Sequence, residues 1–386
     1  MTRDPLGVAV VGFGWMGHVH ARAYSRVLHH YAQLPLAPNL VMVADPEPER
    51  RADAIERFGF AHGTARWHDV LDDDRVQAVS VTAPNFLHRQ IGEAVARAGK
   101  HLWIEKPVGL VASDAETIAS AVRDSHVQSA VGFNYRNAPA VEHARSLIDQ
   151  GRIGTITNAR FKLLTDYAAH PQGALTWRFK RQEGGSGVLG DLVSHGVDLA
   201  RYLLGDIHSL VADAAIFIPE RPSPAGTGSH FALAEGGELG RVENDDYVSC
   251  LVRFASGARG SLEASRVSVG DQCSYGFEIH GTKGALHWDF RRMGELGVSL
   301  GEDYLEQSVR TELVGPTHGE AAAFQPGSGI ALGYDDLKVI EAARFLQSIV
   351  EEKPRGATVQ DAVQSARALD GMARSAQDRC WVTLRE

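Results

Sequence analysis

Cysteine is scarce in this chain of 386 residues, and positive charge is in deficit. The three cysteines, Cys250, Cys273 and Cys380, are widely spaced and form no Cys-x-x-Cys pair, which excludes a cysteine zinc site and favours a reduced compartment. Asp and Glu outnumber Lys and Arg by 48 to 39, giving a net charge of −9. This balance argues against nucleic acid or an anionic membrane as the partner.

Long hydrophobic runs are also missing. No apolar stretch approaches the ~18 residues that a membrane-spanning helix needs. The N-terminal segment lacks the basic region and long apolar core of a signal peptide. With 44% hydrophobic and 23% charged residues, the composition is that of an ordinary globular protein. We therefore expect a cytoplasmic protein that is long enough for two domains.

Three glycines near the N-terminus form a recognisable motif. The apolar run 7–11 leads into GFGWMGHVHARAY, where Gly12, Gly14 and Gly17 fit Gly-x-Gly-x-x-Gly. Glycines at this spacing permit a tight turn, close approach of the backbone to a pyrophosphate, and close packing of a helix whose N-terminus favours the anion. The motif alone is weak, but a strand precedes it and an amphipathic segment follows. The residues expected at this nucleotide site are Gly12, Phe13, Gly14, Trp15, Met16 and Gly17.

A second apolar strand, predicted at 40–45, ends in Asp45. An acid at this place normally accepts hydrogen bonds from the adenosine ribose hydroxyls and favours NAD over NADP. The distance from the glycine motif is longer than usual, and we interpret 29–39, which contains two prolines, as an inserted loop. The alternative role of Asp45 is that of a helix N-cap. Arg50 and Arg51 follow closely and leave NADP open as a cofactor.

Strands and helices go on alternating as far as residue 133. The predicted strands are 78–82, 101–105 and 128–133, and the predicted helices are 88–98 and 113–124. This alternation predicts a parallel sheet with helices on both faces, which binds ligands at the carboxyl ends of its strands. TAPNFLH, with Thr82 and Pro84, and EKPVG begin at such ends and should line the same crevice as the glycine turn.

The pattern changes after residue 151. The segments 155–164, 208–218, 247–267 and 275–290 read as strands, with hairpin turns at Ser256-Gly257 and Thr282-Lys283-Gly284. The Pro/Gly-rich segment 219–240 is interpreted as a mobile surface loop, and helices are predicted at 334–352 and 359–377. We thus expect an α/β Rossmann domain over 1–133. An α+β domain with an open-faced, mostly antiparallel sheet is expected over 134–386, for substrate binding and oligomerisation.

The segment GDLVSHGVDLARYLLGD, 190–206, is predicted to be one helix that is nearly apolar all round and therefore buried. Asp191, His195, Asp198 and Tyr202 nevertheless fall on one stripe, within an arc of about 60°. Asp191 and His195 are four residues apart, so their side chains can touch. A carboxylate fixes the tautomer of an imidazole and raises its basicity, which suits a general base.

Lys106 stands in the EKP segment, where Pro107 restricts its backbone. An ammonium beside a substrate oxygen would stabilise a developing alkoxide. Together with His195 as base, this suits oxidation of an alcohol. Taken singly, a His–Asp pair is more often structural and a strand-end lysine more often a surface charge. The other histidines show no metal-ligand spacing, so no metal is expected.

Six segments, in order, carry a resemblance to a known family: VGFGWMGHVHARAY, TAPNFLH, WIEKPVG, GFNYRNAPAV, TWRF and GSGVLGDLVSHGVDLARYLLG. Over nearly the whole chain they resemble the glucose–fructose oxidoreductase, inositol dehydrogenase and rhizopine-type oxidoreductase family (Gfo/Idh/MocA). The Pro-containing insert at 29–39 and the GFNYRNAPAV segment look most like the levoglucosan dehydrogenases of this family and related inositol or glycoside dehydrogenases. The resemblance implies a Rossmann domain, then an open-faced sheet domain that commonly builds homodimers or homotetramers.

The resemblance also implies roles for individual residues. Lys106, Asp191 and His195 match the catalytic Lys, Asp and His of the family, and would contact the substrate. Further positions that it places along the cofactor and substrate cleft are Asn85, His88, Glu105, Lys106, Trp177 and Arg178, with Asn134 and Tyr135 near the substrate hydroxyls.

The expected activity is hydride transfer between NAD (or NADP) and a secondary hydroxyl of a sugar, anhydrosugar or cyclitol. A redox-neutral glycoside-cleaving enzyme that oxidises C3 transiently is the main alternative, because it would need the same residues. A non-catalytic nucleotide-binding regulator is a third, disfavoured because it has no need of Lys106, Asp191 and His195 together.

Overall fold

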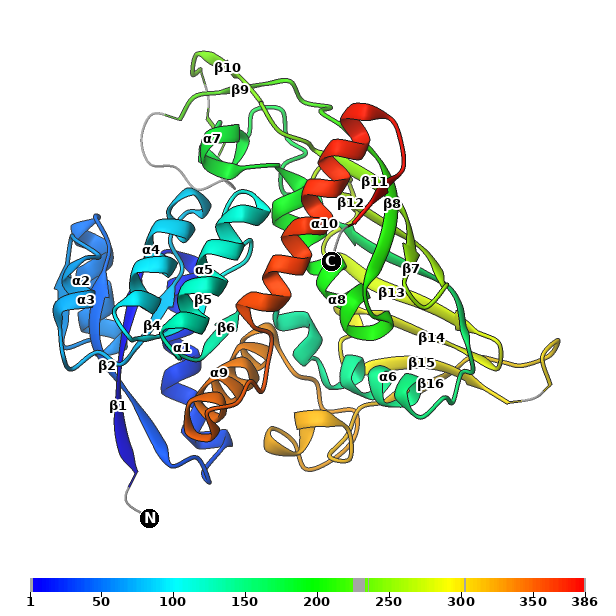
Figure 1. The fold of residues 1–386 in the computed structure, drawn as a ribbon, viewed down its shortest axis with the longest axis horizontal. Helices are drawn as coiled ribbons and strands as arrows, with labels where there is room; N and C mark the ends of the chain where they lie inside the picture. The colour runs from blue at the N-terminus through cyan, green and yellow to red at the C-terminus, as the bar shows by residue number, and fades with distance from the viewer. Residues whose placement is uncertain (1–2, 225–232, 235, 302, 385–386) are drawn as a thin grey trace. The chain divides into compact units, whose positions relative to one another are not determined.

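The computed structural model describes residues 3–224, 233–234, 236–301 and 303–384 (Figure 1). Two compact units divide the chain: Met1–Asn137 with Leu332–Gln364, and Ala138–Ala331 with Ser365–Glu386. The sequence predicts domains over 1–133 and 134–386, whereas the first unit also takes in a late segment. Among the described residues, no helix is both long and apolar enough to cross a membrane.

The first unit is built on a six-stranded sheet in the order β3-β2-β1-β4-β5-β6, in which every paired strand is parallel. This is the predicted Rossmann arrangement. Its strands are β1 (Asp4–Val11), β2 (Leu36–Ala44), β3 (His62–Thr64), β4 (Ala78–Val81), β5 (His101–Ile104) and β6 (Ser129–Val131). The central strands are buried on both faces, as the near-continuous apolar runs of the sequence require.

The helices of the first unit lie where the sequence predicts them, except for two of four residues each, at 69–72 and 134–137, which the sequence does not predict. They are α1 (Trp15–His30), α2 (Pro48–Phe58), α3 (Asp69–Asp72), α4 (Asn85–Arg97), α5 (Ala112–Asp124), the 3-10 turn η1 (Asn134–Asn137) and α9 (Tyr334–Glu351). Helix α9 packs along α1, and two ion pairs, Arg22–Asp335 and Arg26–Asp336, join them at 2.6 Å each. The late segment thereby becomes part of this unit.

The predicted loop at 29–39 is too long. Helix α1 runs to His30 and β2 already begins at Leu36, so only five residues connect them. The two prolines are the reason for expecting a loop, but Pro38 lies within β2, which pairs with β3 only from Met42 onward. Around Pro38 the strand is therefore an edge on that side, where a missing N–H donor costs no ladder hydrogen bond.

The second unit holds a nine-stranded sheet in the order β16-β15-β14-β13-β7-β12-β11-β8-β17. Only the β7–β12 pair is parallel, so the sheet is mostly antiparallel, as predicted. Its strands are β7 (Ile156–Leu164), β8 (Ile207–Ala215), β11 (Tyr247–Phe254), β12 (Arg259–Ser265), β13 (Ser274–Gly281), β14 (Gly284–Asp289), β15 (Glu295–Leu300), β16 (Arg310–Leu313) and β17 (Val382–Thr383). Both predicted hairpin turns are confirmed, by the β11–β12 and β13–β14 pairings.

Most of the remaining helices belong to the second unit. They are α6 (Pro139–Asp149), α7 (Arg181–Gly184), α8 (Ser194–Leu204) and α10 (Val359–Asp378), whose first residues lie in the first unit, with the short turns η2 (Trp177–Phe179), η3 (Leu189–Val193), η4 (Phe290–Arg292) and η5 (Gly319–Ala323). Helix α8 packs on β7, so closely that a Cβ on Gly196 would lie 2.6 Å from a Leu163 methyl.

Two expectations for this unit need correction. The predicted single helix at 190–206 begins with a π-helical turn, η3, and becomes regular only in α8. The predicted loop at 219–240 contains two short paired strands, β9 (Glu220–Pro222) and β10 (Leu239–Arg241). Pro/Gly-rich composition hides such a pair because three-residue strands show no periodicity. The middle of that segment, 225–232 and 235, lies outside the described residues.

Candidate active site

The glycine turn has a different use for each of its glycines. Gly12 has φ +88° and donates its N–H to the carbonyl of Ala44 at 2.8 Å, and a Cβ there would lie 2.8 Å from the backbone nitrogen of Ala83. A Cβ on Gly17 would overlap the Gly12 carbonyl. At Gly14, by contrast, a Cβ would meet no described atom within 4 Å. The first and third glycines thus serve the turn and the packing of α1, and the second leaves room for a ligand.

The other residues of this turn divide into core and surface. The Phe13 side chain is buried in the cluster between sheet and helices, so only its backbone faces the turn. Trp15 is 63% exposed and stacks on Tyr334 of α9, with ring centroids 5.4 Å apart. The Tyr334 hydroxyl also lies 3.8 Å from the Met16 sulfur. Tyr334 was missed from the sequence because it lies more than 300 residues from the turn.

Asp45 follows the last residue of β2 and is only 2% exposed. One carboxylate oxygen accepts the Phe13 N–H at 2.6 Å and the other accepts the Glu47 N–H at 2.9 Å. The N-cap interpretation is wrong, since Glu47 holds the N-cap position of α2. The two bonds tie the glycine turn to the end of β2. Each oxygen keeps a further lone pair, so acceptance of ribose hydroxyls stays a prediction.

Residues of the TAPNFLH segment support the turn from β4 and α4. The Thr82 hydroxyl donates to the carbonyl of Gly12 at 2.5 Å, and Pro84 and Asn85 begin α4 half-buried beside it. His88 is 1% exposed, and its ring nitrogens lie 2.7 Å from the carbonyl oxygens of Pro107 and Ala83. His88 therefore links the segment after β4 to the segment after β5.

Glu105, the residue before the half-buried Lys106, lies in a buried network of charges. Its Oε1 is 2.5 Å from the Lys338 ammonium and 3.0 Å from the His20 ring. Lys338 also contacts Glu341 at 2.9 Å. The Glu105 carboxylate thus contacts buried side chains of the first unit, whereas the resemblance places Glu105 along the cofactor cleft.

The segment after β6 supplies two predicted site residues, Asn134 and Tyr135, both buried. Within the described residues neither amide atom of Asn134 has a hydrogen-bond partner. A buried primary amide without partners costs free energy unless a ligand or water completes it. With the open space at Gly14, this amide fits a dinucleotide such as NAD bound along the first unit.

In the second unit, Asp191 lies in the π-helical turn η3. Its Oδ2 accepts the Tyr167 hydroxyl at 2.6 Å, and its Oδ1 is 3.4 Å from the Arg178 guanidinium. Burial, then the neighbouring carboxylate, raises the pKa of Tyr167 well above its usual range, so the phenol stays protonated and donates. Turns of this kind are rare and recur at functional sites. Tyr167 was missed because it stands alone on the strand-to-loop segment after β7.

Trp177 and Arg178, predicted to line the cleft, form the short turn η2. The Arg178 guanidinium lies over the Trp177 ring at 4.7 Å while it contacts Asp191. The Asn244 side-chain amide donates to the Arg178 backbone carbonyl at 2.8 Å and so helps to hold the turn in place. Within the second unit, Arg178 is therefore brought to the predicted catalytic carboxylate.

The predicted polar stripe on α8 divides in two. His195 is 8% exposed and Asp198 2% exposed, so the expectation of a buried helix is confirmed. Tyr202, one turn further on, lies beside Arg145 of α6, whose guanidinium is 5.7 Å from the ring and also donates to the Tyr202 carbonyl. That end of the stripe packs helix against helix, and the catalytic role expected of Asp191 and His195 stays a prediction.

Two family models match the two parts of the chain. Residues 6–133 match the model of an oxidoreductase family with an NAD-binding Rossmann fold, and 141–287 match the Gfo/Idh/MocA C-terminal domain. The levoglucosan dehydrogenase of Pseudarthrobacter phenanthrenivorans is 37% identical over 380 residues, covering 98% of this chain and 97% of the relative. The chain belongs to the Gfo/Idh/MocA oxidoreductase family.

Other members of the family bear this out. The inositol 2-dehydrogenase of Rhizobium meliloti is 30% identical over 302 residues, covering 76% of this chain and 79% of the relative. A solved structure of levoglucosan dehydrogenase with NADH and levoglucosan superposes with a TM-score of 0.93 at 35% identity, over 99% of this chain and 100% of that one. Its form without ligands gives 0.95 at 36% identity, over 99% of each chain. The predicted fold class is thus confirmed.

Asp45 should set the choice between dinucleotides. Replacing Asp45 with Ser removes the carboxylate that would repel a 2′-phosphate, so the preference for NADH over NADPH should fall roughly tenfold or more. Arg50 lies 3.5 Å from Asp45 and should then pair with the phosphate, so adding Arg50→Ala should restore part of the preference. Fluorescence titration measures both constants. Arg57→Ala, which removes an ion pair with Asp53 and a contact with the Phe58 ring but none with Asp45, is the control, and tighter binding of NADPH by the unaltered protein would contradict the role.

The bond from Tyr167 should matter for turnover. Tyr167→Phe keeps the ring and removes the donor to a carboxylate, a bond of about 1.5–3 kcal/mol. We expect kcat/KM to fall by roughly tenfold or more, with the affinity for NADH unchanged. Tyr247→Phe removes a comparable but exposed bond, to Glu263, and should have no effect. Equal turnover of the two variants would show that Tyr167 does not act through Asp191.

Glu341 should make stability depend on pH. Burial raises its pKa from 4.5 to about 7, and Glu105 adds to the rise while Lys338 opposes it. Between those values the folded state binds a proton that the unfolded state has lost, so this contribution is full below about pH 4.5 and disappears as pH rises through 7. Between pH 5 and 8 the urea midpoint should therefore fall further for the unaltered protein than for Glu341→Gln. Glu351→Gln, exposed on the same helix, should follow the unaltered protein; parallel curves for all three would contradict the shift.

Proposed function

We propose that the protein is an NAD-dependent dehydrogenase acting on a secondary hydroxyl of a sugar, anhydrosugar or cyclitol. The observation that carries the proposal is end-to-end similarity to a levoglucosan dehydrogenase in a chain that keeps Lys106, Asp191 and His195. Levoglucosan, an anhydrosugar, is the first substrate to test, and inositols are the second because an inositol 2-dehydrogenase is also similar. NADP is the alternative cofactor.

The chain's own residues supply the acid–base chemistry. His195, buried on α8, takes the hydroxyl proton as the alcohol is oxidised. Asp191, fixed by Tyr167 and Arg178, orients the imidazole. Lys106, beyond β5, stabilises the alkoxide that develops on the substrate oxygen. Bound NAD would supply the hydride acceptor for this oxidation.

The remaining predicted residues have supporting places in this scheme. The glycine turn would hold the pyrophosphate through the backbone of α1's first turn. Asn134 and Tyr135, buried after β6, would contact cofactor and substrate hydroxyls. Trp177 and Arg178, in η2, would line the cofactor and substrate cleft. His88 and Glu105 would act through the loops that they hold.

Assembly and location belong to the same proposal. We infer a homodimer or homotetramer, supported by one face of the nine-stranded sheet, where residues of six strands surround a hollow of about 370 Å³. A cytoplasmic location is supported by three cysteines that form no disulfide in the structure.

Incubation with NAD and a sugar decides between the leading activity and its main alternative. A dehydrogenase accumulates NADH, so absorbance at the reduced nicotinamide band should rise with levoglucosan or an inositol and in proportion to substrate consumed. A redox-neutral glycoside-cleaving enzyme releases product without net NADH. His195→Asn should bind NADH yet turn over at least 10²-fold more slowly and lose the acidic limb of the pH–rate profile, because an amide cannot take up the proton. Unchanged rate and profile would place the base elsewhere.

A further inference from the structure

The carboxylate of Glu105 occupies a place built for it inside the first unit. Glu105 directly follows β5, and its N–H bonds to the Val81 carbonyl of β4 at 2.9 Å. The residue that follows β6 is a glycine, Gly132, and this leaves space for the carboxylate, since a Cβ on Gly132 would overlap it. A neutral His20, whose pKa burial lowers to about 4, lies 3.0 Å away and donates from Nε2.

The cation that pairs with Glu105 comes from a segment more than 200 residues later in the chain. Lys338 of α9 is fully buried, and its ammonium lies 2.5 Å from Glu105 and 2.9 Å from Glu341. The Trp103 indole donates to the same Glu341 oxygen at 2.7 Å. Buried ion clusters of this kind are at best neutral for stability compared with apolar packing, so stability alone does not account for it.

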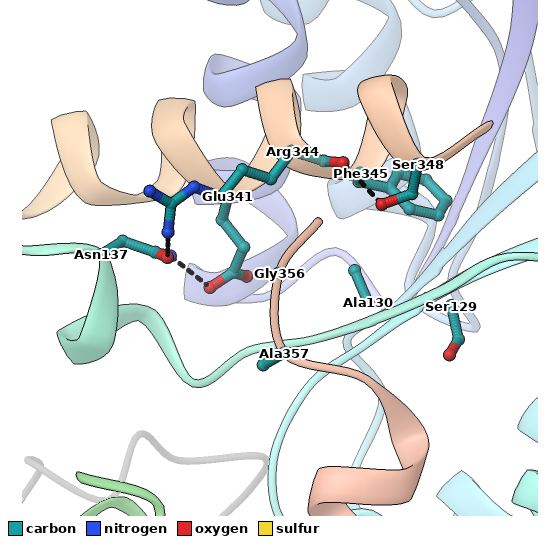
Figure 2. Close-up of a pocket in the computed structure, with 9 residues that line it drawn as sticks. All are labelled: Ser129, Ala130, Asn137, Glu341, Arg344, Phe345, Ser348, Gly356 and Ala357. Atoms are coloured by element: carbon teal, nitrogen blue, oxygen red, sulfur yellow. Dashed lines mark hydrogen bonds between the residues drawn. The ribbon is translucent and has the colours of Figure 1, made fainter. Parts of the chain in front are cut away.

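Glu341 is held from its other side as well. Figure 2 shows Asn137 between Glu341 and Arg344: the Asn137 amide donates to Glu341 at 3.4 Å, and Arg344 donates to the Asn137 oxygen at 2.8 Å. The cavity that these residues line measures about 10 Å³, about the room of one water molecule. The lysine is therefore fixed by two carboxylates, each of which is fixed in turn.

A metal site is the rival interpretation of this cluster. His20, Glu105 and Glu341 could bring ligand atoms within 4.8 Å of one another. The Lys338 ammonium, however, lies in contact with both carboxylates, and a cation there would have to displace it against charge repulsion. The cluster is therefore complete with the lysine.

The peptide that carries Lys106 is held at both ends. On one side Glu105 is fixed by Lys338, and on the other the Pro107 carbonyl lies 2.7 Å from the buried His88 ring. A side chain that must place a charge against a substrate oxygen depends on the backbone beneath it. We propose that Lys338 is a positioning residue for the reaction, which through Glu105 fixes the backbone of Lys106; the inference rests on the proposed role of Lys106.

The test is a double-mutant cycle on turnover. Lys338→Met removes the ammonium and keeps the chain length, and should lower kcat roughly 10- to 100-fold through misplacement of Lys106, with the dissociation constant of NADH unchanged. In a Lys106→Met background the same change should cost no further turnover, because there is no ammonium left to misplace. Glu105→Gln, which keeps the shape of the anchor, should give a smaller loss that is likewise absent in that background. If Lys338→Met does not fold, Glu105→Gln takes its place in the cycle.

The matched control lies on the same helix. Asp335→Asn breaks the two bonds of 2.6 and 3.0 Å to Arg22 that join α9 to α1, without touching Glu105. It should lower the melting temperature and leave kcat unchanged. Losses that add in the double variant, or an equal loss of kcat in Asp335→Asn at a similar melting temperature, would overturn the inference alone. Wild-type turnover in Lys106→Met would overturn the proposed role of Lys106 itself, and the inference with it.

Discussion

The contact between Lys338 and Glu105 makes two distant parts of the sequence into one unit. Without the late segment that carries α9, the first unit would bury the Glu105 carboxylate with no lysine beside it. A buried carboxylate without a cation is among the costliest arrangements in a protein interior. Helix α9 removes that cost and brings with it the ion pairs to α1 and the ring of Tyr334 against Trp15. The glycine turn and the EKP segment, which are separate motifs along the sequence, thus share one support.

Local motifs carried most of the fold prediction. Five of the six strands in the first unit are predicted because buried parallel strands are short apolar runs, and the turn at Gly12 is predicted because its backbone leaves no room for a side chain. The three-residue β3 is not predicted, since two of its three residues are exposed and it forms no apolar run. The error at 29–39 has the opposite origin. Pro38 reads as a loop signal until it is known that its strand has a free edge there, and strand order is a property of the assembled sheet.

The site was less open to prediction, because its partners come from segments with no signal of their own. Asp191 and His195 could be selected as polar residues on an apolar helix. The donors that fix Asp191, Tyr167 and Arg178, lie on an irregular stretch where no periodicity places one side chain relative to another. Asp45 shows a related limit: its position at the end of a strand predicts a role in ribose binding, but a motif does not reveal that both oxygens already bind backbone N–H groups.

The π-helical turn shows why spacing alone was not enough. An i, i+4 pair on a regular helix would set Asp191 directly over His195, and that geometry was the reason for selecting them. The turn at Leu189–Val193 holds an additional residue relative to the regular repeat and rotates Asp191 relative to α8. The carboxylate is then reached by a phenol and a guanidinium from outside the helix. A carboxylate held by two donors has little freedom left, and that rigidity suits the role proposed for Asp191, which is to hold the His195 imidazole in one tautomer.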